Sequence, residues 1–143
     1  MPTFKNILCP VDFSSCSRNA LTAATELART SEAALTIIHV WQPPLFGAPD
    51  ATIPGEVIQT MADTAEHTLA DWEASARAAG IKTVTSTMVA GTPWSEIIRL
   101  VGVTHADLVV MGTHGRTGLD HALIGSVAER VVRHARCAVL VMR

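Results

Sequence analysis

The chain has 143 residues and a formal net charge of −2; 48% of its residues are apolar and 17% are charged. This composition excludes a disordered chain, and the length is typical of one domain with one core. Only two of the eleven basic residues are lysines, so the chain lacks the basic surface that DNA or RNA requires, and we expect no nucleic-acid partner.

Apolar runs rich in β-branched residues alternate along the chain with stretches of helical periodicity. The runs predict five strands, at residues 7–11, 35–40, 84–89, 108–111 and 138–142. The periodic stretches predict four helices, with apolar positions within 21–28, 61–76, 94–101 and 127–132. Thr92 followed by Pro93 is typical of a helix start, and Gly80 of a helix end.

Strict alternation of strand and helix predicts an α/β fold. We expect a single doubly wound, Rossmann-like domain over residues 1–143, with a five-stranded parallel sheet and about four helices on both faces. In such sheets ligands bind beyond the carboxyl ends of the strands, near the point where the strand order reverses.

Residues 41–57, WQPPLFGAPDATIPGEV, form the one irregular stretch. Four prolines exclude regular helix or central strand there until about Pro54. This segment follows the second predicted strand, so it either folds over the crevice as a lid, docks a partner, or is a plain surface connection.

Cys9, Cys16 and Cys137 are an odd number of cysteines without CxxC spacing. That pattern favours free thiols over disulfides or a zinc site. No apolar run approaches the roughly 18 residues of a membrane span, and MPTFKNILCP does not read as a signal peptide. We therefore expect a cytoplasmic protein without a membrane association.

Glycines gather after the fourth predicted strand, in the spacing G-x2-G-x9-G-S formed by Gly112, Gly115, Gly125 and Ser126. Backbone N–H groups that turn inward without a Cβ form an anion-binding nest, and the helix that begins near Ser126 adds its own free N–H groups. The pattern predicts a site for nucleotide phosphates. The alternative is that the glycines only make a tight turn; a P-loop or a dinucleotide fingerprint does not fit.

The sequence resembles the universal stress protein family over nearly its whole length. The similarity rests on ILCPVDFS, IIHV, MGTHGRTGL, IGSVAERVVRHARC and AVLVMR. In that family the glycine signature marks the subgroup that binds ATP, so the resemblance implies an ATP site here. One departure is Ala138, where the family often has proline; this change concerns a turn and not the site.

The resemblance also implies individual roles in the ATP site. Pro10 and Val11 would shape the adenine pocket, and Val40 would meet the base through its backbone. Asp12 would accept a ribose hydroxyl or help to position a divalent cation. An equally good interpretation makes Asp12 the N-cap of the helix that follows.

Four further residues complete the predicted site or lie beside it. Met111 and Val127 flank the glycine signature and belong to the ATP-binding set. Arg116 lies inside the loop, where it either meets phosphate oxygens or is simply exposed. His114 would lie near the phosphates, but no other histidine shows metal-ligand spacing with it, so we expect no metal site; Mg²⁺ or Mn²⁺ would arrive with ATP.

Three functions remain open at this point. The first is an ATP-binding stress or signalling module, without catalytic residues, whose nucleotide changes a surface that a protein partner reads. The second is a slow ATP hydrolase or phosphotransferase, for which Asp12, His114 and Arg116 are the only candidates. The third is a dimeric scaffold without nucleotide. Family resemblance and the apolar final strand together predict a homodimer through that strand.

Overall fold

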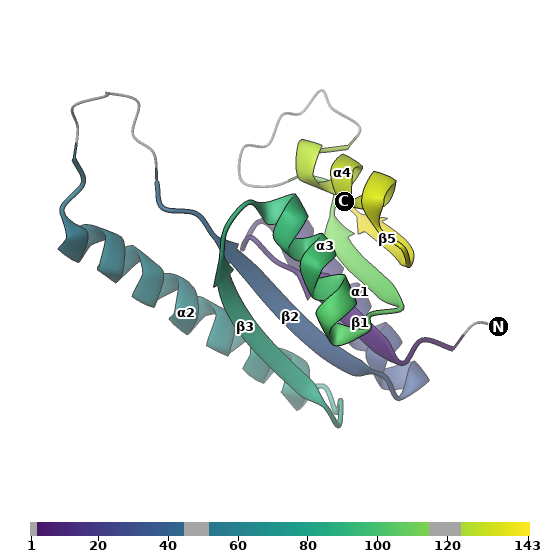
Figure 1. The fold of residues 1–143 in the computed structure, drawn as a ribbon. Helices are drawn as coiled ribbons and strands as arrows, with labels where there is room; N and C mark the ends of the chain where they lie inside the picture. The colour runs from purple at the N-terminus through teal and green to yellow at the C-terminus, as the bar shows by residue number, and fades with distance from the viewer. Residues whose placement is uncertain (1–2, 45–51, 115–123) are drawn as a thin grey trace.

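The computed structural model describes residues 3–44, 52–114 and 124–143 (Figure 1). Its strands are β1 (Asn6–Pro10), β2 (Ala34–Trp41), β3 (Val84–Ala90), β4 (Leu108–Gly112) and β5 (Ala138–Met142). Its helices are α1 (Ser15–Ser31), α2 (Gly55–Ala78), α3 (Pro93–Thr104) and α4 (Ser126–His134). The five strands form one sheet in the order β3-β2-β1-β4-β5, and all pairs are parallel, which confirms the predicted fold class.

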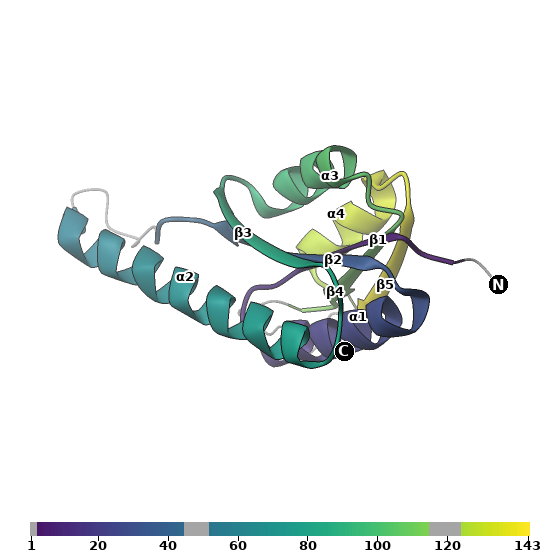
Figure 2. The ribbon, with the colours of Figure 1, turned by 90° about the horizontal axis from the view of Figure 1, so that it is seen from below.

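Two helices cover each face of the sheet, as Figure 2 shows with α1 and α2 on one side and α3 and α4 on the other. Strand residues alternate between the two layers, as the period-two geometry of a strand requires. Ile7, Cys9 and Ile37 pack toward α1 and α2, whereas Leu8 and Ile38 pack toward α3 and α4. Each layer is built mainly from aliphatic side chains, so both faces of the sheet are dry.

The predicted helix boundaries are confirmed where the sequence has strong signals. Thr92 occupies the N-cap of α3 with Pro93 in the first turn, although the Thr92 side chain makes no capping hydrogen bond. Gly80 follows the end of α2 with a φ of 96°. The predicted irregular stretch 41–57 is too long at both ends, because β2 includes Trp41 and α2 begins at Gly55, directly after Pro54. Residues 45–51 of this stretch lie outside the described residues.

The strand order reverses between β1 and β4, because the chain runs outward through β2 and β3 and then returns to add β4 on the other side of β1. At the amino end of the sheet, the Asp107 carboxylate accepts hydrogen bonds from the Lys5 N–H at 2.8 Å and the Asn6 N–H at 3.1 Å. Asp107, just before β4, therefore links β4 to the start of β1 at the amino end of the sheet. The crevice expected of a doubly wound sheet lies at the opposite, carboxyl end.

Candidate functional site

The turn between β1 and α1 forms one wall of the crevice. The strand ends at Pro10, one residue earlier than predicted, and the Val11 N–H donates to the Ile38 carbonyl at 2.8 Å. Asp12 Oδ1 accepts from the Ser14 N–H at 3.0 Å, and Ser14 Oγ accepts from the Ser17 N–H at 3.2 Å. The helix N-cap is therefore Ser14, and the interpretation of Asp12 as the N-cap is wrong.

Phe13 follows Asp12 with a φ of 66°, a left-handed conformation that non-glycine residues adopt rarely. Its ring lies 4.5 Å from the His39 ring and 5.3 Å from the Trp72 ring, centroid to centroid. The Arg18 guanidinium lies 3.9 Å from the centroid of Trp72 on the same side of the sheet. This aromatic cluster holds the turn that carries Asp12, and nothing in the glycine signature pointed to it.

The second wall is the carboxyl end of β4, where Gly112 lies directly against α1. A Cβ built on Gly112 would lie 2.8 Å from Cys16 Cβ, 2.9 Å from the Cys16 carbonyl carbon and 3.0 Å from Ser17 N. Ordinary carbon contacts are about 3.5–4.0 Å, so no side chain fits at this position. Close packing alone therefore requires a glycine at 112.

Gly125 is also sterically restricted. A Cβ there would lie 2.6 Å from the Thr113 carbonyl oxygen, which accepts the Gly125 N–H, while the Thr113 N–H donates to the Met142 carbonyl at 2.7 Å. Residue 125 thus returns to the end of β4 and brings the start of α4 beside the crevice. Steric contacts with neighbouring atoms therefore account for the glycine at 112 and at 125; Gly115 lies outside the described residues.

The amino end of α4 lies at the carboxyl end of β4, next to Thr113. Gly125 is its N-cap, and because glycine has no side chain, no side-chain hydrogen bond caps the first turn. Ser126 is exposed and Val127 is half-buried at that end. The N–H groups of a first helical turn and the positive end of the helix dipole favour anions. Glu129, which pairs with Arg133 at 2.7 Å, is the one acidic residue in the first turn of α4.

The predicted apolar residues lie on both layers. Val11 packs toward α1 and α2, whereas Val40, Met111 and Val127 pack together with the α3 and α4 layer. Pro10, Val11 and Met111 are buried in the structure. Arg116 lies outside the described residues.

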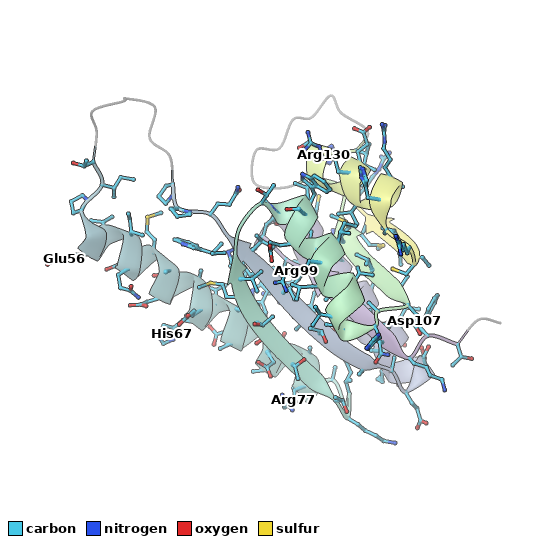
Figure 3. The ribbon with its side chains drawn as sticks, viewed as in Figure 1. Glu56, His67, Arg77, Arg99, Asp107 and Arg130 are labelled. Atoms are coloured by element: carbon cyan, nitrogen blue, oxygen red, sulfur yellow. The ribbon has the colours of Figure 1, made fainter. Side chains whose placement is uncertain are left out.

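Two further basic side chains, His114 after β4 and Arg130 on α4, lie close in sequence to the predicted site residues. His114 Nδ1 is 3.1 Å from the Thr113 hydroxyl. Arg130, labelled on α4 in Figure 3, lies four residues after Ser126 and stacks its guanidinium 5.5 Å from the centroid of the Trp94 ring. Arg130 is not among the predicted site residues; its i, i+4 spacing from Ser126, which puts two residues on one helix face, is the signal that could have found it.

Within residues 3–44, 52–114 and 124–143, no three His, Cys, Asp or Glu side chains gather closely enough to hold a metal ion. All three cysteines are unpaired thiols. Burial raises the pKa of the fully enclosed Cys9 thiol, so Cys9 stays protonated and unreactive. In the part of the chain that the structure describes, no helix is long and apolar enough to cross a membrane.

The parallel sheet with strand order β3-β2-β1-β4-β5 and helices on both faces places this protein in the class of doubly wound α/β proteins. Within that class, the model of the universal stress protein family matches residues 3–143, so the chain belongs to the universal stress protein family. A universal stress protein of Methanocaldococcus jannaschii is 35% identical over 141 residues, which covers 98% of this chain and 82% of that protein.

Solved structures of the family have the same fold. Universal stress protein UspA from Lactobacillus plantarum superimposes with a TM-score of 0.88 at 26% identity, and the match covers 100% of both chains. A universal stress protein in complex with cAMP matches with a TM-score of 0.76 at 24% identity over 99% of this chain and 98% of that one. The universal stress protein from Archaeoglobus fulgidus in complex with dAMP matches with a TM-score of 0.70 at 21% identity. This match covers 99% of this chain and 100% of that one.

Proposed function

We propose that this chain binds ATP in the crevice at the carboxyl ends of β1 and β4 and acts in the cytoplasm as a nucleotide-dependent stress-response or signalling module. The observation that carries the proposal is the amino end of α4, which has no side-chain cap and is held at the carboxyl end of β4 by the contact of Gly125 with Thr113. Free amides suit the phosphates, and the opposite wall offers a carboxylate, Asp12, to the ribose.

The relatives support an adenine nucleotide in particular. Two universal stress proteins with this fold are described in complexes with cAMP and with dAMP. Both ligands combine adenine with a phosphate, and the proposed site pairs apolar residues with a helix amino end. ATP adds two further phosphates, and Mg²⁺ or Mn²⁺ would arrive with the nucleotide and be held chiefly by its phosphates.

Calorimetric titration of the purified protein with ATP, AMP and GTP tests the proposal. Ser126→Ala should weaken ATP binding by roughly 1.5–3 kcal/mol if its hydroxyl meets a charged phosphate oxygen. Ser95→Ala is the matched control, because the Ser95 hydroxyl also lies in a first helical turn but donates to the Thr92 carbonyl of α3. Absence of ATP binding by the parent at millimolar nucleotide would overturn the proposal, and phosphate release in the same samples separates binding from hydrolysis.

We further propose that two copies pair through β5. This strand is an edge of the sheet, and its Leu140 side chain is 37% exposed. The Met142 carbonyl points to β4, so alternation directs the main chain of Val139 outward. Val139→Pro removes one outward N–H, a change that edge strands tolerate, and should convert a dimer into a monomer by light scattering. A monomeric parent at micromolar concentration would refute the pairing.

A further inference from the structure

His39 is a buried imidazole in a strand that otherwise directs aliphatic side chains into the core. It is 7% exposed, and its Nδ1 lies 2.8 Å from the Val11 carbonyl oxygen. Because a carbonyl oxygen only accepts, Nδ1 must carry the proton and His39 donates this hydrogen bond. A side chain of β2 thus engages the main chain of the β1–α1 turn.

This hydrogen bond occurs where the β1–β2 ladder would otherwise continue. The Val11 N–H donates to the Ile38 carbonyl, so Ile38, and Val40 two residues later, direct their main-chain groups toward β1. In a regular parallel ladder the next donor is the Val40 N–H and its acceptor is the Val11 carbonyl. Among the hydrogen bonds of the described residues, the Val11 carbonyl is bonded to His39, and none joins it to the Val40 N–H.

Phe13 takes the chain away from β2 at this point. Its left-handed φ of 66° bends the backbone off the line of the strand, and its ring lies between the rings of His39 and Trp72. An uncommon backbone conformation persists only where its surroundings hold it, and such positions cluster at ligand sites. His39 therefore holds the turn twice, through the Val11 carbonyl and through the Phe13 ring.

We propose that His39 is a positioning residue of the nucleotide site, which keeps the turn at residues 11–14 off β2 so that the N–H and C=O of Val40 face the crevice. This inference rests on the proposed binding of ATP. The N–H donor and the C=O acceptor of Val40 match the N1 acceptor and the N6 donor of adenine. Guanine presents a donor at N1 and an acceptor at O6, so the same pair rejects it. His39 thereby contributes to the preference for adenine without touching the base.

Three substitutions separate the position of the donor from the size of the side chain. His39→Asn places an amide N–H near the position of Nδ1, His39→Gln places it farther out, and His39→Leu removes it. We expect His39→Asn to keep ATP affinity within about threefold of the parent. The Gln and Leu variants should bind ATP about tenfold more weakly, which is about 1.4 kcal/mol of binding free energy. In both variants the ratio of ATP affinity to GTP affinity should fall as well. His67→Leu, an exposed histidine on α2, is the control for loss of an imidazole.

Amide hydrogen exchange gives a readout without nucleotide. In the free parent the Val40 amide should exchange faster than the Ile38 amide, which lies inside the ladder, and His39→Leu should slow it as the Val40 N–H closes on the Val11 carbonyl. A Val40 amide as protected as that of Ile38 in the parent would overturn the inference. The inference would also be overturned if His39→Asn and His39→Gln bound ATP with the same affinity as each other and GTP with the same affinity as each other. This comparison holds even if His39→Leu fails to fold.

The outcomes also distinguish this inference from the proposed function. A parent that binds no adenine nucleotide removes both. A parent that binds ATP while His39→Leu binds it with the same affinity and selectivity removes only the role of His39.

Discussion

Gly112→Ala is the sharpest test of how β4 meets α1. The added Cβ would lie 2.8 Å from Cys16 Cβ, so the two elements must separate by about 0.7 Å to reach an ordinary carbon contact. Two of its three neighbours are backbone atoms of Cys16 and Ser17, which move only if the first turn of α1 moves. Overpacking of this kind costs about 1–3 kcal/mol, and the backbone neighbours place this case near the upper end.

Gly102→Ala is the matched control, because it adds the same atom to α3 where no neighbour lies within 4 Å. Replacing glycine in a helix should stabilise the protein by about 0.5–1 kcal/mol. The two variants should therefore differ by about 3 kcal/mol and move the urea midpoint in opposite directions, together by about 1–2 M. Unfolding is followed by circular dichroism at matched protein concentrations, since any dimer makes stability depend on concentration.

A Gly112→Ala protein within about 0.5 kcal/mol of the parent would refute the close approach of β4 and α1. The expected result has a bearing on nucleotide binding as well. Since a side chain at 112 displaces the start of α1, weaker ATP binding by such a variant says little about phosphate contacts. Ser126→Ala, at an exposed position, is the cleaner probe.

Three further outcomes are expected. Hydrogen bonds from Ser86 and then Arg77 lower the pKa of the Glu73 carboxyl. The ionised carboxylate therefore stabilises the fold above about pH 4.3, and this stabilisation is lost as pH falls through the lowered pKa. In urea titrations Glu73→Gln should cost under about 1 kcal/mol at pH 7 and nothing at about pH 2. Cys9 should react with a thiol reagent only at the rate of unfolding, so immediate labelling by mass spectrometry would contradict its burial. Ser14→Ala should cost about 1 kcal/mol in thermal unfolding and Thr92→Ala, whose side chain makes no cap bond, only a few tenths.

The architecture could be predicted because each element has a local signal. β-branched runs and helical periodicity depend on neighbours in the chain, and their strict alternation leaves few topologies. The end of β1 could not be predicted, because Val11 is apolar and reads as strand. The chain turns there because Phe13 adopts a left-handed conformation, and a phenylalanine gives no warning of that.

The glycines after the fourth strand predict a phosphate site, and that site stays a prediction. What the structure adds could not be read from the spacing: the atoms that exclude a side chain at Gly112 belong to Cys16 and Ser17, far away in sequence. The role of His39 could not be predicted for the same reason, because its hydrogen-bond partner, the Val11 carbonyl, becomes its neighbour only when β1 and β2 pair. Periodicity reports which face a residue takes, and not which atom it meets.

Helix α2 is longer than the sheet on which it lies. Its 24 residues span about 36 Å, whereas the seven residues of β3 span about 23 Å, and Figure 1 shows its first turns projecting beyond the strands. The buried residues of α2 begin at Ala65, and Val57 and Met61 before it are exposed. The overhanging turns rest on their own hydrogen bonds, so they should fray first on warming, and a protease should nick α2 ahead of Ala65 while the rest of the domain stays folded.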